Sequence, residues 1–235
     1  MSQLALPLFR PPAFRAEEFI PDASNAAALR WLEEPSRWPN SRLVLAGPPG
    51  TGKTHLLHAA AQRRGWALED ARALRGVPRA PARGIALDEA DLPGEEAALF
   101  HLLNACLEAG VPVLMAAPHP PARWRVALPD LRSRLAAAGL AVLEEPSEAL
   151  LGALWAKQLS ERQLQLDPAL LAQLRRRLPR DAATVAEAAA RLDRASLAAG
   201  RLTRAVAQAA LAPLLADDAS MTEAEAPLPE APRLL

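Results

Sequence analysis

A glycine-rich turn that ends in a basic residue and a hydroxyl residue is the segment with the most chemical content. Residues 47–54 fit the pattern G-x-x-x-x-G-K-[S/T] and read Gly47-Pro48-Pro49-Gly50-Thr51-Gly52-Lys53-Thr54. Glycine allows positive φ angles and leaves no side chain in the way, so the backbone N–H groups of such a turn can point at an anion. Lys53 supplies positive charge for the outer phosphates, and Thr54 supplies a hydroxyl for Mg²⁺. The segment is therefore predicted to bind the phosphates of ATP or ADP.

Two carboxylates follow the next credible apolar strand along the chain. Residues 85–87 are Ile-Ala-Leu, and Asp88 and Glu89 come directly after them. In phosphoryl-transfer sites the first such acid holds Mg²⁺, directly or through water, and the second can polarise the attacking water. A strand that ends in acids is also common as a solvated turn. Downstream of a phosphate loop, however, the pattern favours Asp88 as a metal and cofactor residue and Glu89 as a catalytic residue.

Four arginines are candidates for charge stabilisation, because a guanidinium that reaches a γ-phosphate acts in cis or from a neighbouring molecule. Arg134 lies in the segment 130–135, Asp-Leu-Arg-Ser-Arg-Leu, before a predicted strand. Arg180 opens a helix further along, and Arg123 and Arg125 lie in a proline-rich loop. Spacing alone does not separate a catalytic arginine from a solvated one, so all four stay open at this point.

The elements that must position these residues alternate between short apolar runs and amphipathic stretches, which is typical of parallel strands joined by helices. The predicted strands are residues 43–46, 66–68, 85–87, 111–116 and 140–143, and the predicted helices are residues 24–33, 55–64, 95–109 and 131–138. The phosphate loop leaves the first strand and enters a helix whose N-terminus attracts anions. The fold class is therefore α/β, with a parallel five-stranded sheet.

After Pro146 the pattern changes to helices alone. Helices are predicted for residues 147–162, 168–178 and 181–199, and a fourth begins at Thr203. Acidic residues, proline and alanine follow from residue 216 without periodicity, which is typical of disorder. We predict an N-terminal peptide (residues 1–13), a nucleotide-binding core (14–146), a small C-terminal helical lid domain (147–215) and a disordered tail (216–235).

Composition narrows the class of protein further. Of the 235 residues 51% are hydrophobic, which is enough for a sizeable core. Lys and Arg total 27, as do Asp and Glu, and this balance argues against binding to nucleic acid through overall charge. The single Cys106 excludes an internal disulfide and fits a reducing compartment. No segment approaches membrane-spanning length. We expect a cytoplasmic protein with no membrane partner.

In this order the motifs resemble the DnaA-like AAA+ family, which includes the module of the bacterial replication initiator DnaA and the Hda-type regulators that inactivate it. The resemblance covers about residues 3 to 212. It implies an AAA+ core with a helical lid, ATP or ADP with Mg²⁺ as cofactors, and DnaA as a partner. It also implies roles for individual residues: Phe19, Ile20 and Asn25 near the adenine, an arginine finger at Arg134, and a lid arginine that senses nucleotide at Arg180.

The N-terminal peptide is similar to the Q-L-x-L-P-L motif by which Hda-type proteins dock on the β sliding clamp of DNA polymerase III. The matching residues are Gln3, Leu4, Leu6, Pro7, Leu8 and Phe9. An extended peptide can place its apolar side chains in a pocket and hydrogen-bond through the glutamine, and proline reduces the entropy cost of ordering. A generic leader rich in leucine and proline is the alternative.

The chain departs from the family pattern at three places. Pro118 falls near the position of a polar sensor residue after the fourth strand, and a proline cannot orient the attacking water. The stretch between the second and third strands is short, so a helix there is expected to be vestigial. No helix-turn-helix domain follows the lid, so we expect contact with DNA to be mainly indirect.

The expected function is negative regulation of DNA replication initiation. Residues 3–9 would tether the protein to the clamp loaded on DNA, and Arg134 would stimulate hydrolysis of the ATP bound by DnaA. Intrinsic hydrolysis is expected to be weak. Two alternatives remain: an AAA+ motor or loader, of the helicase or clamp-loader type, that works by its own hydrolysis, and a nucleotide-stabilised clamp adaptor without effect on DnaA. The sequence leaves open whether ATP or ADP is the working form and whether the chain forms a homo-oligomer.

Overall fold

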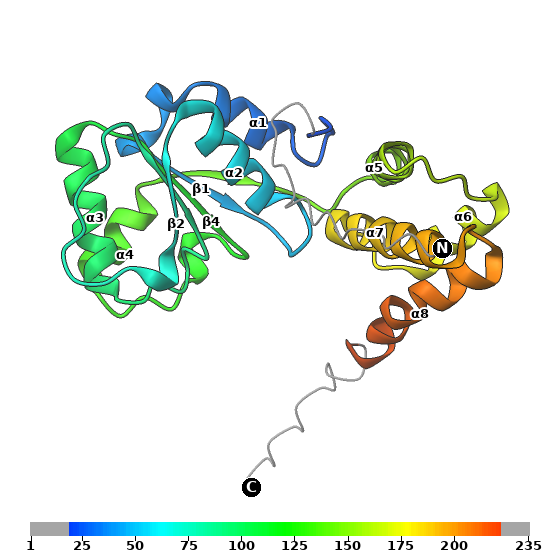
Figure 1. Cartoon of the computed structure of the whole chain (residues 1–235). Coiled ribbons are helices and arrows are strands. Elements are labelled where there is room, and N and C mark those ends of the chain that lie inside the picture. Colours follow the sequence, from blue (N-terminus) through cyan, green and yellow to red (C-terminus); the bar gives the residue numbers. More distant parts are fainter. Residues whose placement is uncertain (1–18, 222–235) are drawn as a thin grey trace, which may run out of the picture. The chain divides into compact units, whose positions relative to one another are not determined.

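The structure, a computed structural model, describes residues 19–221, in which five strands and four helices are followed by four helices alone (Figure 1). The strands are β1 (Arg42–Ala46), β2 (Ala67–Asp70), β3 (Ile85–Asp88), β4 (Val113–Ala117) and β5 (Gly139–Val142). The helices are α1 (Ala26–Glu33), α2 (Lys53–Arg64), α3 (Glu96–Ala109), α4 (Pro129–Ala136), α5 (Glu148–Glu161), α6 (Pro168–Arg177), α7 (Ala182–Ala199) and α8 (Arg204–Met221). Short 3-10 turns occupy Pro35–Arg37, Pro39–Ser41, Ala71–Ala73 and Pro121–Arg123.

The five strands form one parallel sheet in the order β2-β3-β4-β1-β5. All residues of β1 and β4 are buried, as expected of central strands covered on both faces. In the edge strand β5, buried and exposed residues alternate instead. The predicted α/β class and five-stranded sheet are confirmed.

Two apolar clusters cover the two faces of the sheet, because successive side chains of a strand point to opposite sides. Val44, Leu87 and Met115 pack with α3 and α4 on one face. Leu43, Leu45 and Leu114 pack with α1 and α2 on the other. Figure 1 shows these helix pairs on opposite sides of the strands. Residues that follow the carboxyl ends of β1 and β3 therefore meet at one edge of a rigid three-layer scaffold.

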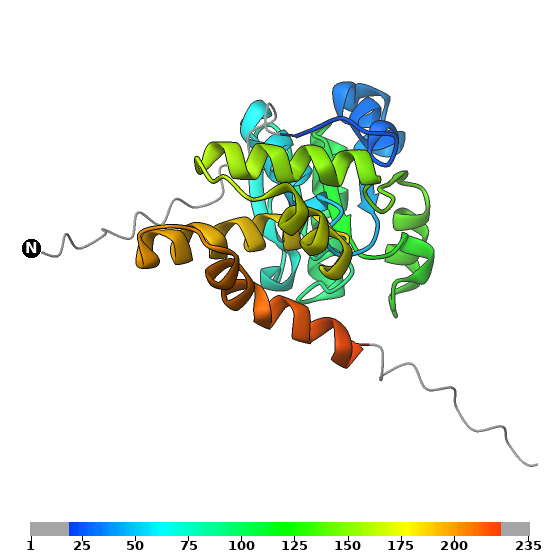
Figure 2. The ribbon, with the colours of Figure 1, turned by 90° about the vertical axis from the view of Figure 1, so that its right-hand side faces the viewer.

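The chain divides into two compact units. The first runs up to Ala153 and also includes Asp181–Ala183, and the second contains Leu154–Arg180 and the residues from Thr184 on. The second unit is built from helices (Figure 2). Leu170, Leu174, Val185, Leu192 and Leu211 are buried. The boundary falls inside α5, later than the predicted boundary at residues 146–147. None of the helices between residues 19 and 221 is long and apolar enough to span a bilayer.

Several element bounds differ from the predicted ones for local reasons. The first helix begins at Ala26 rather than at residue 24, because Ser24 and Asn25 use their side chains in the preceding turn. The short connection between β2 and β3 holds only the turn Ala71–Ala73, as expected. The last helix runs to Met221, past the predicted start of the tail at residue 216. Alanine favours helix, and four alanines lie among residues 209–216. Residues 222–235 lie outside the described part.

Candidate functional site

The phosphate loop connects the carboxyl end of β1 to the start of α2. Gly50 and Gly52 adopt φ angles of 75° and 95°, which favour glycine. Gly47 packs so closely that a Cβ there would lie 2.3 Å from the carbonyl oxygen of Leu143. Gly52 precedes α2 and no side chain caps that helix start, so the first N–H groups of the helix have no side-chain acceptor there. The backbone thus forms a cradle of donors in which side chains have no room.

Lys53 is the first residue of α2, and its ammonium turns back onto the loop. Its Nζ donates to the carbonyl oxygens of Gly47 and Pro48, at 2.7 Å each. Burial lowers the pKa of Lys53, while the nearby carboxylates of Asp88, Glu89 and Asp91 act in the opposite direction. The positive charge therefore lies between the loop and the acidic site, where the outer phosphates of a nucleotide would carry the matching negative charge.

Asp88 and Glu89 lie at the carboxyl end of β3, on the same edge of the sheet as the loop. The Oδ1 atom of Asp88 accepts a hydrogen bond of 3.0 Å from the backbone N–H of Glu89. Glu89 has a φ of 51°, a left-handed conformation that costs a non-glycine residue about 1 kcal/mol or more. Such strain is common at functional sites, and here it falls on the residue that directly follows β3.

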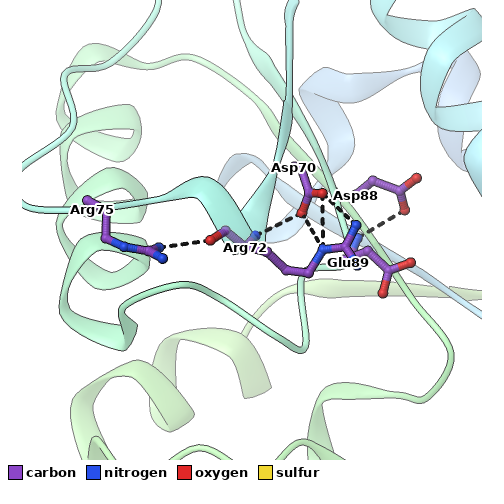
Figure 3. A network of polar contacts seen from close by, with 5 residues as sticks. All are labelled: Asp70, Arg72, Arg75, Asp88 and Glu89. Carbon is purple, nitrogen blue, oxygen red and sulfur yellow. Dashed lines mark hydrogen bonds and ion pairs between the residues drawn. The ribbon is translucent and has the colours of Figure 1, made fainter.

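A further acid and an arginine, which the sequence did not single out, adjoin this site (Figure 3). Asp70 ends β2 and pairs in register with Asp88. The guanidinium of Arg72 donates hydrogen bonds to the Asp70 carboxylate, with Nη2 2.6 Å from Oδ2 and Nε 3.0 Å from both oxygens. These hydrogen bonds raise the pKa of Arg72, and the charges of Glu89 and Asp88 act in the same direction. No recognisable spacing links Asp70 to Asp88, so only the sheet register reveals the neighbourhood.

The segment 19–25 lies against the phosphate loop. Phe19 approaches Gly52, where a Cβ would lie 3.1 Å from the Phe19 ring, and the rings of Phe19 and His55 have centroids 5.5 Å apart. The buried Asn25 accepts from the N–H of Asp22 and donates to the carbonyl oxygen of Ile20, at 2.9 and 3.0 Å. Of the residues predicted near the adenine, Phe19 therefore reaches the loop, whereas Asn25 uses both ends of its amide to hold the segment.

The residues at this edge fit a nucleotide with Mg²⁺. The loop supplies backbone donors and one ammonium for phosphate oxygens, and Thr54 is exposed at the start of α2. A hydroxyl and a carboxylate beside phosphates are ligands that Mg²⁺ takes in such sites, and Thr54 and Asp88 provide them. The predicted loop and acidic residues are thus brought to one edge of the sheet.

Comparisons with known proteins show a likeness of fold to solved structures. No protein-family model and no curated protein matches the sequence. Among solved structures, domain III of the replication initiation protein DnaA from Thermotoga maritima is similar with a TM-score of 0.70 and 19% identity, over 87% of this chain and 98% of that one. AMPPCP-bound DnaA from Aquifex aeolicus is similar with a TM-score of 0.60 and 20% identity, over 77% of this chain and 65% of that one. A RuvB mutant from Thermotoga maritima is similar with a TM-score of 0.62 and 16% identity, over 84% of this chain and 71% of that one.

The chain has an α/β fold similar to that of DnaA domain III. The fold places Pro118 directly after β4, next to the phosphate loop. Its carbonyl oxygen accepts the N–H of Gly47 at 3.3 Å. A proline has no polar side-chain atom, so this contact is structural and offers nothing to orient a water molecule.

Arg134 lies elsewhere in the first unit, in the last turn of α4. Its guanidinium carbon is 4.9 Å from the centroid of the Phe100 ring, and its buried Nε atom has no hydrogen-bond partner among residues 19–221. Arg134 and Arg42 line the same cavity, and Arg42 is the first residue of β1. The phosphate loop follows the last residue of that strand, which spans roughly 13 Å. Arg134 therefore lies at the N-terminal ends of the strands, and the phosphate loop lies at their carboxyl ends.

The roles of the remaining predicted residues stay predictions. Arg180 is exposed and belongs to the second unit, whereas Ala182 belongs to the first and donates to the carbonyl oxygen of Gly50 at 3.0 Å. Arg123 and Arg125 are exposed on the segment before α4. The clamp-motif residues 3–9 lie outside the described residues, and their role stays a prediction.

Asp22 anchors the segment 19–25 and makes its stability dependent on pH. Its carboxylate accepts hydrogen bonds from the hydroxyl of Ser24 at 2.6 Å, the hydroxyl of Ser147 at 2.7 Å and the N–H of Ser24 at 3.1 Å. These bonds lower the pKa of Asp22 from 3.8 to about 2. A carboxylate whose pKa is depressed on folding stabilises the folded state above its unfolded pKa, and this stabilisation disappears as the pH falls through the folded pKa.

We predict that Asp22→Asn lowers the free energy of unfolding at neutral pH by about 1 kcal/mol, a value reduced for solvent screening. The deficit should narrow as the pH falls from 3.8 toward about 2, where the wild-type carboxylate also becomes protonated. Urea denaturation across this range measures it, with exposed Glu145→Gln as the control. A deficit that stays constant down to the acid limit would contradict the role of the charge.

Proposed function

We propose that this protein binds ATP or ADP with Mg²⁺ and, as Hda-type regulators do, inactivates the replication initiator DnaA by stimulating hydrolysis of the ATP that DnaA holds. The observation that supports this most is the separation of two charged features. The phosphate loop and the acidic residues share one edge of the sheet, whereas Arg134 lies at the other. A nucleotide site and an arginine finger so arranged act on two different nucleotides.

Nucleotide binding rests on the loop geometry. Backbone donors at Gly50–Gly52 and the ammonium of Lys53 would hold the phosphates, and Mg²⁺ held by Thr54 and Asp88 would neutralise phosphate charge. AMPPCP-bound DnaA, which is similar in fold, supports an adenine nucleotide as the ligand. Phe19 lies against the loop and would shield one side of the bound nucleotide. Arg180 would report on the nucleotide from the lid.

The action on DnaA would come from Arg134. A guanidinium that reaches the γ-phosphate of ATP on a neighbouring molecule stabilises the charge that develops in transfer and accelerates hydrolysis roughly 10³-fold or more. The guanidinium of Arg134 lies over the ring of Phe100, which supports it through a cation–π contact, while its Nε has no partner in the described residues. The side chain is thus supported but not neutralised.

Localisation to replicating DNA would come from the N-terminal peptide. Residues 3–9 would dock on the β sliding clamp of DNA polymerase III loaded on DNA, so contact with DNA would be mainly indirect. A tether of this kind raises the local concentration of one AAA+ module near another and makes a weak contact productive. The protein would then act in the cytoplasm only where a clamp is present.

One alternative has an observation in its favour. Glu89 follows Asp88 at the edge that holds the loop, as in an enzyme that hydrolyses its own ATP as a motor or loader. Pro118 weighs against it, because it supplies no side-chain group beside the loop to orient water. Steady-state turnover of the isolated protein separates the two, since a motor should hydrolyse ATP briskly without DnaA.

We predict that Arg134→Ala abolishes stimulation of DnaA hydrolysis, because the finger's contribution of roughly 10³-fold or more is removed. The measurement is release of phosphate from ATP-loaded DnaA in the presence of loaded clamp. Arg132→Ala is the matched control, since Arg132 is exposed two residues earlier on the same helix. Arg134→Lys should recover little, because lysine lacks the planar guanidinium. Equal stimulation by Arg134→Ala and the wild type would remove the finger from the proposal.

We also predict that deletion of residues 3–9 abolishes retention of the protein by immobilised clamp. Loss of the peptide removes the apolar anchors and the glutamine. The same deletion should reduce stimulation of DnaA hydrolysis when the clamp is loaded on DNA. An adaptor without effect on DnaA would bind the clamp through the peptide but leave hydrolysis unchanged. Retention of the deleted protein by the clamp would contradict the docking role.

A further inference from the structure

The N-terminal end of β1 holds a cavity with an unbalanced positive charge. The cavity has a volume of about 350 Å³ and lies between β1, α3 and α4. Arg42 and Arg134 line it, together with Asn40, Ser133 and Asp130. It is at the edge of the sheet opposite the phosphate loop, because Arg42 begins the strand that the loop follows.

Arg42 is the one charged residue that is buried among the described residues, with 2% of its surface exposed. Its Nη2 donates to the backbone carbonyl of Leu103 at 2.9 Å, but its buried Nε atom has no hydrogen-bond partner in residues 19–221. Burial lowers the pKa of Arg42, and the positive charge of Arg134 lowers it further. A buried cation beside a second cation is costly unless an anion completes the arrangement.

The cavity lining does not supply that anion. Asp130 is exposed and forms no ion pair with either arginine within the described part of the chain. The other polar groups are already engaged, since Ser133 donates to the carbonyl of Asp130 at 2.9 Å and Asn40 donates to the carbonyl of Ala137 at 3.1 Å. The Nε atoms of Arg42 and Arg134 are the buried donors left without an acceptor.

We propose that this cavity binds a phosphate group between Arg42 and Arg134. A phosphate carries about −1.5 to −2 charges at neutral pH and offers several acceptor oxygens, so one group can balance two guanidinium ions. A carboxylate carries a single charge and would leave one buried cation unmatched. Guanidinium is also suited to phosphate, because its donors form a rigid fork that pairs with two oxygens at once.

Two sources can supply the phosphate. One is free inorganic phosphate, and the other is the terminal phosphate of a nucleotide held by a neighbouring AAA+ molecule. The second source rests on the proposed function, because Arg134 would then reach the neighbour's γ-phosphate with Arg42 as a second cation behind it. In that case the γ-phosphate would lie between the two guanidinium ions, and Arg42 would balance the charge that Arg134 leaves unmatched.

The first experiment titrates inorganic phosphate into the full chain after its phosphate loop has been saturated with ADP. Nuclear magnetic resonance of ¹⁵N-labelled arginine follows the Nε–H signals of Arg42 and Arg134. We expect saturable shifts of both signals and roughly tenfold or more weaker binding in Arg42→Gln and Arg134→Gln, because each loses a charge-assisted hydrogen bond. Arg132→Gln, exposed on the same helix, should bind as the wild type does.

Absence of saturable shifts at the two signals in the wild-type protein would overturn the proposal, even if Arg42→Gln failed to fold. Acetate that shifted the signals as strongly as phosphate would overturn it too, since the charge argument excludes an equal carboxylate. Wild-type affinity in Arg134→Gln would show that the cavity does not use this arginine.

The second experiment distinguishes the sources by measuring hydrolysis of DnaA-bound ATP with Arg42→Gln. A lower maximal rate identifies the terminal phosphate of a neighbour's nucleotide, and an unchanged rate identifies free phosphate. Both results presuppose the shifts of the first experiment. If Arg134→Ala leaves DnaA hydrolysis unchanged, the proposed function fails, whereas the phosphate titration does not involve DnaA and still decides the cavity.

Discussion

The proposed function depends on one constraint, which is that concentrated negative charge is held at the carboxyl ends of the strands of a buried parallel sheet. Backbone N–H groups meet that charge better than side chains do, because they are fixed by the strand and helix on either side. β1 is buried along its whole length and α2 packs on the sheet, so the loop between them has fixed ends. Gly47 has no room for a Cβ, and Gly50 and Gly52 take φ angles that favour glycine. A loop that presents its backbone N–H groups between two fixed ends therefore requires glycine at these three positions.

β1 also separates the two positively charged features of the core. Lys53 lies just past its carboxyl end, among the carboxylates of Asp88, Glu89 and Asp91, which partly balance it. Arg42 and Arg134 lie at the other end without a carboxylate partner in the described residues. In the proposed function, the first end would hold the chain's own nucleotide, and the second would receive an anion from outside. The proposal that the protein acts on a neighbouring molecule rests on this asymmetry.

Much of the core could be predicted from the sequence, because its signals are local. Each of three sequence signals reflects a single local segment, and the structure has the expected segment in each case. The glycine and lysine spacing marks the loop before α2, the apolar run before Asp88 marks β3, and the periodicity of residues 95–109 marks α3. What the sequence could not show depends on pairing between distant segments. The order of the strands places Asp70 beside Asp88, and the packing of α3 places Phe100 under Arg134. The burial of Arg42 at the head of an apolar strand has no signature in spacing at all.

Titration of a fluorescent ATP or ADP analogue into the wild-type protein and Lys53→Ala, with Mg²⁺ present, tests the central claim most directly. Arg63→Ala, an exposed substitution on the same helix, serves as the control for loss of positive charge. The account predicts saturable binding by the wild type and the control, and binding weaker by roughly tenfold or more in Lys53→Ala, which loses the charge on the outer phosphates. Equal affinity in all three proteins, or no saturable binding in any of them, would contradict it.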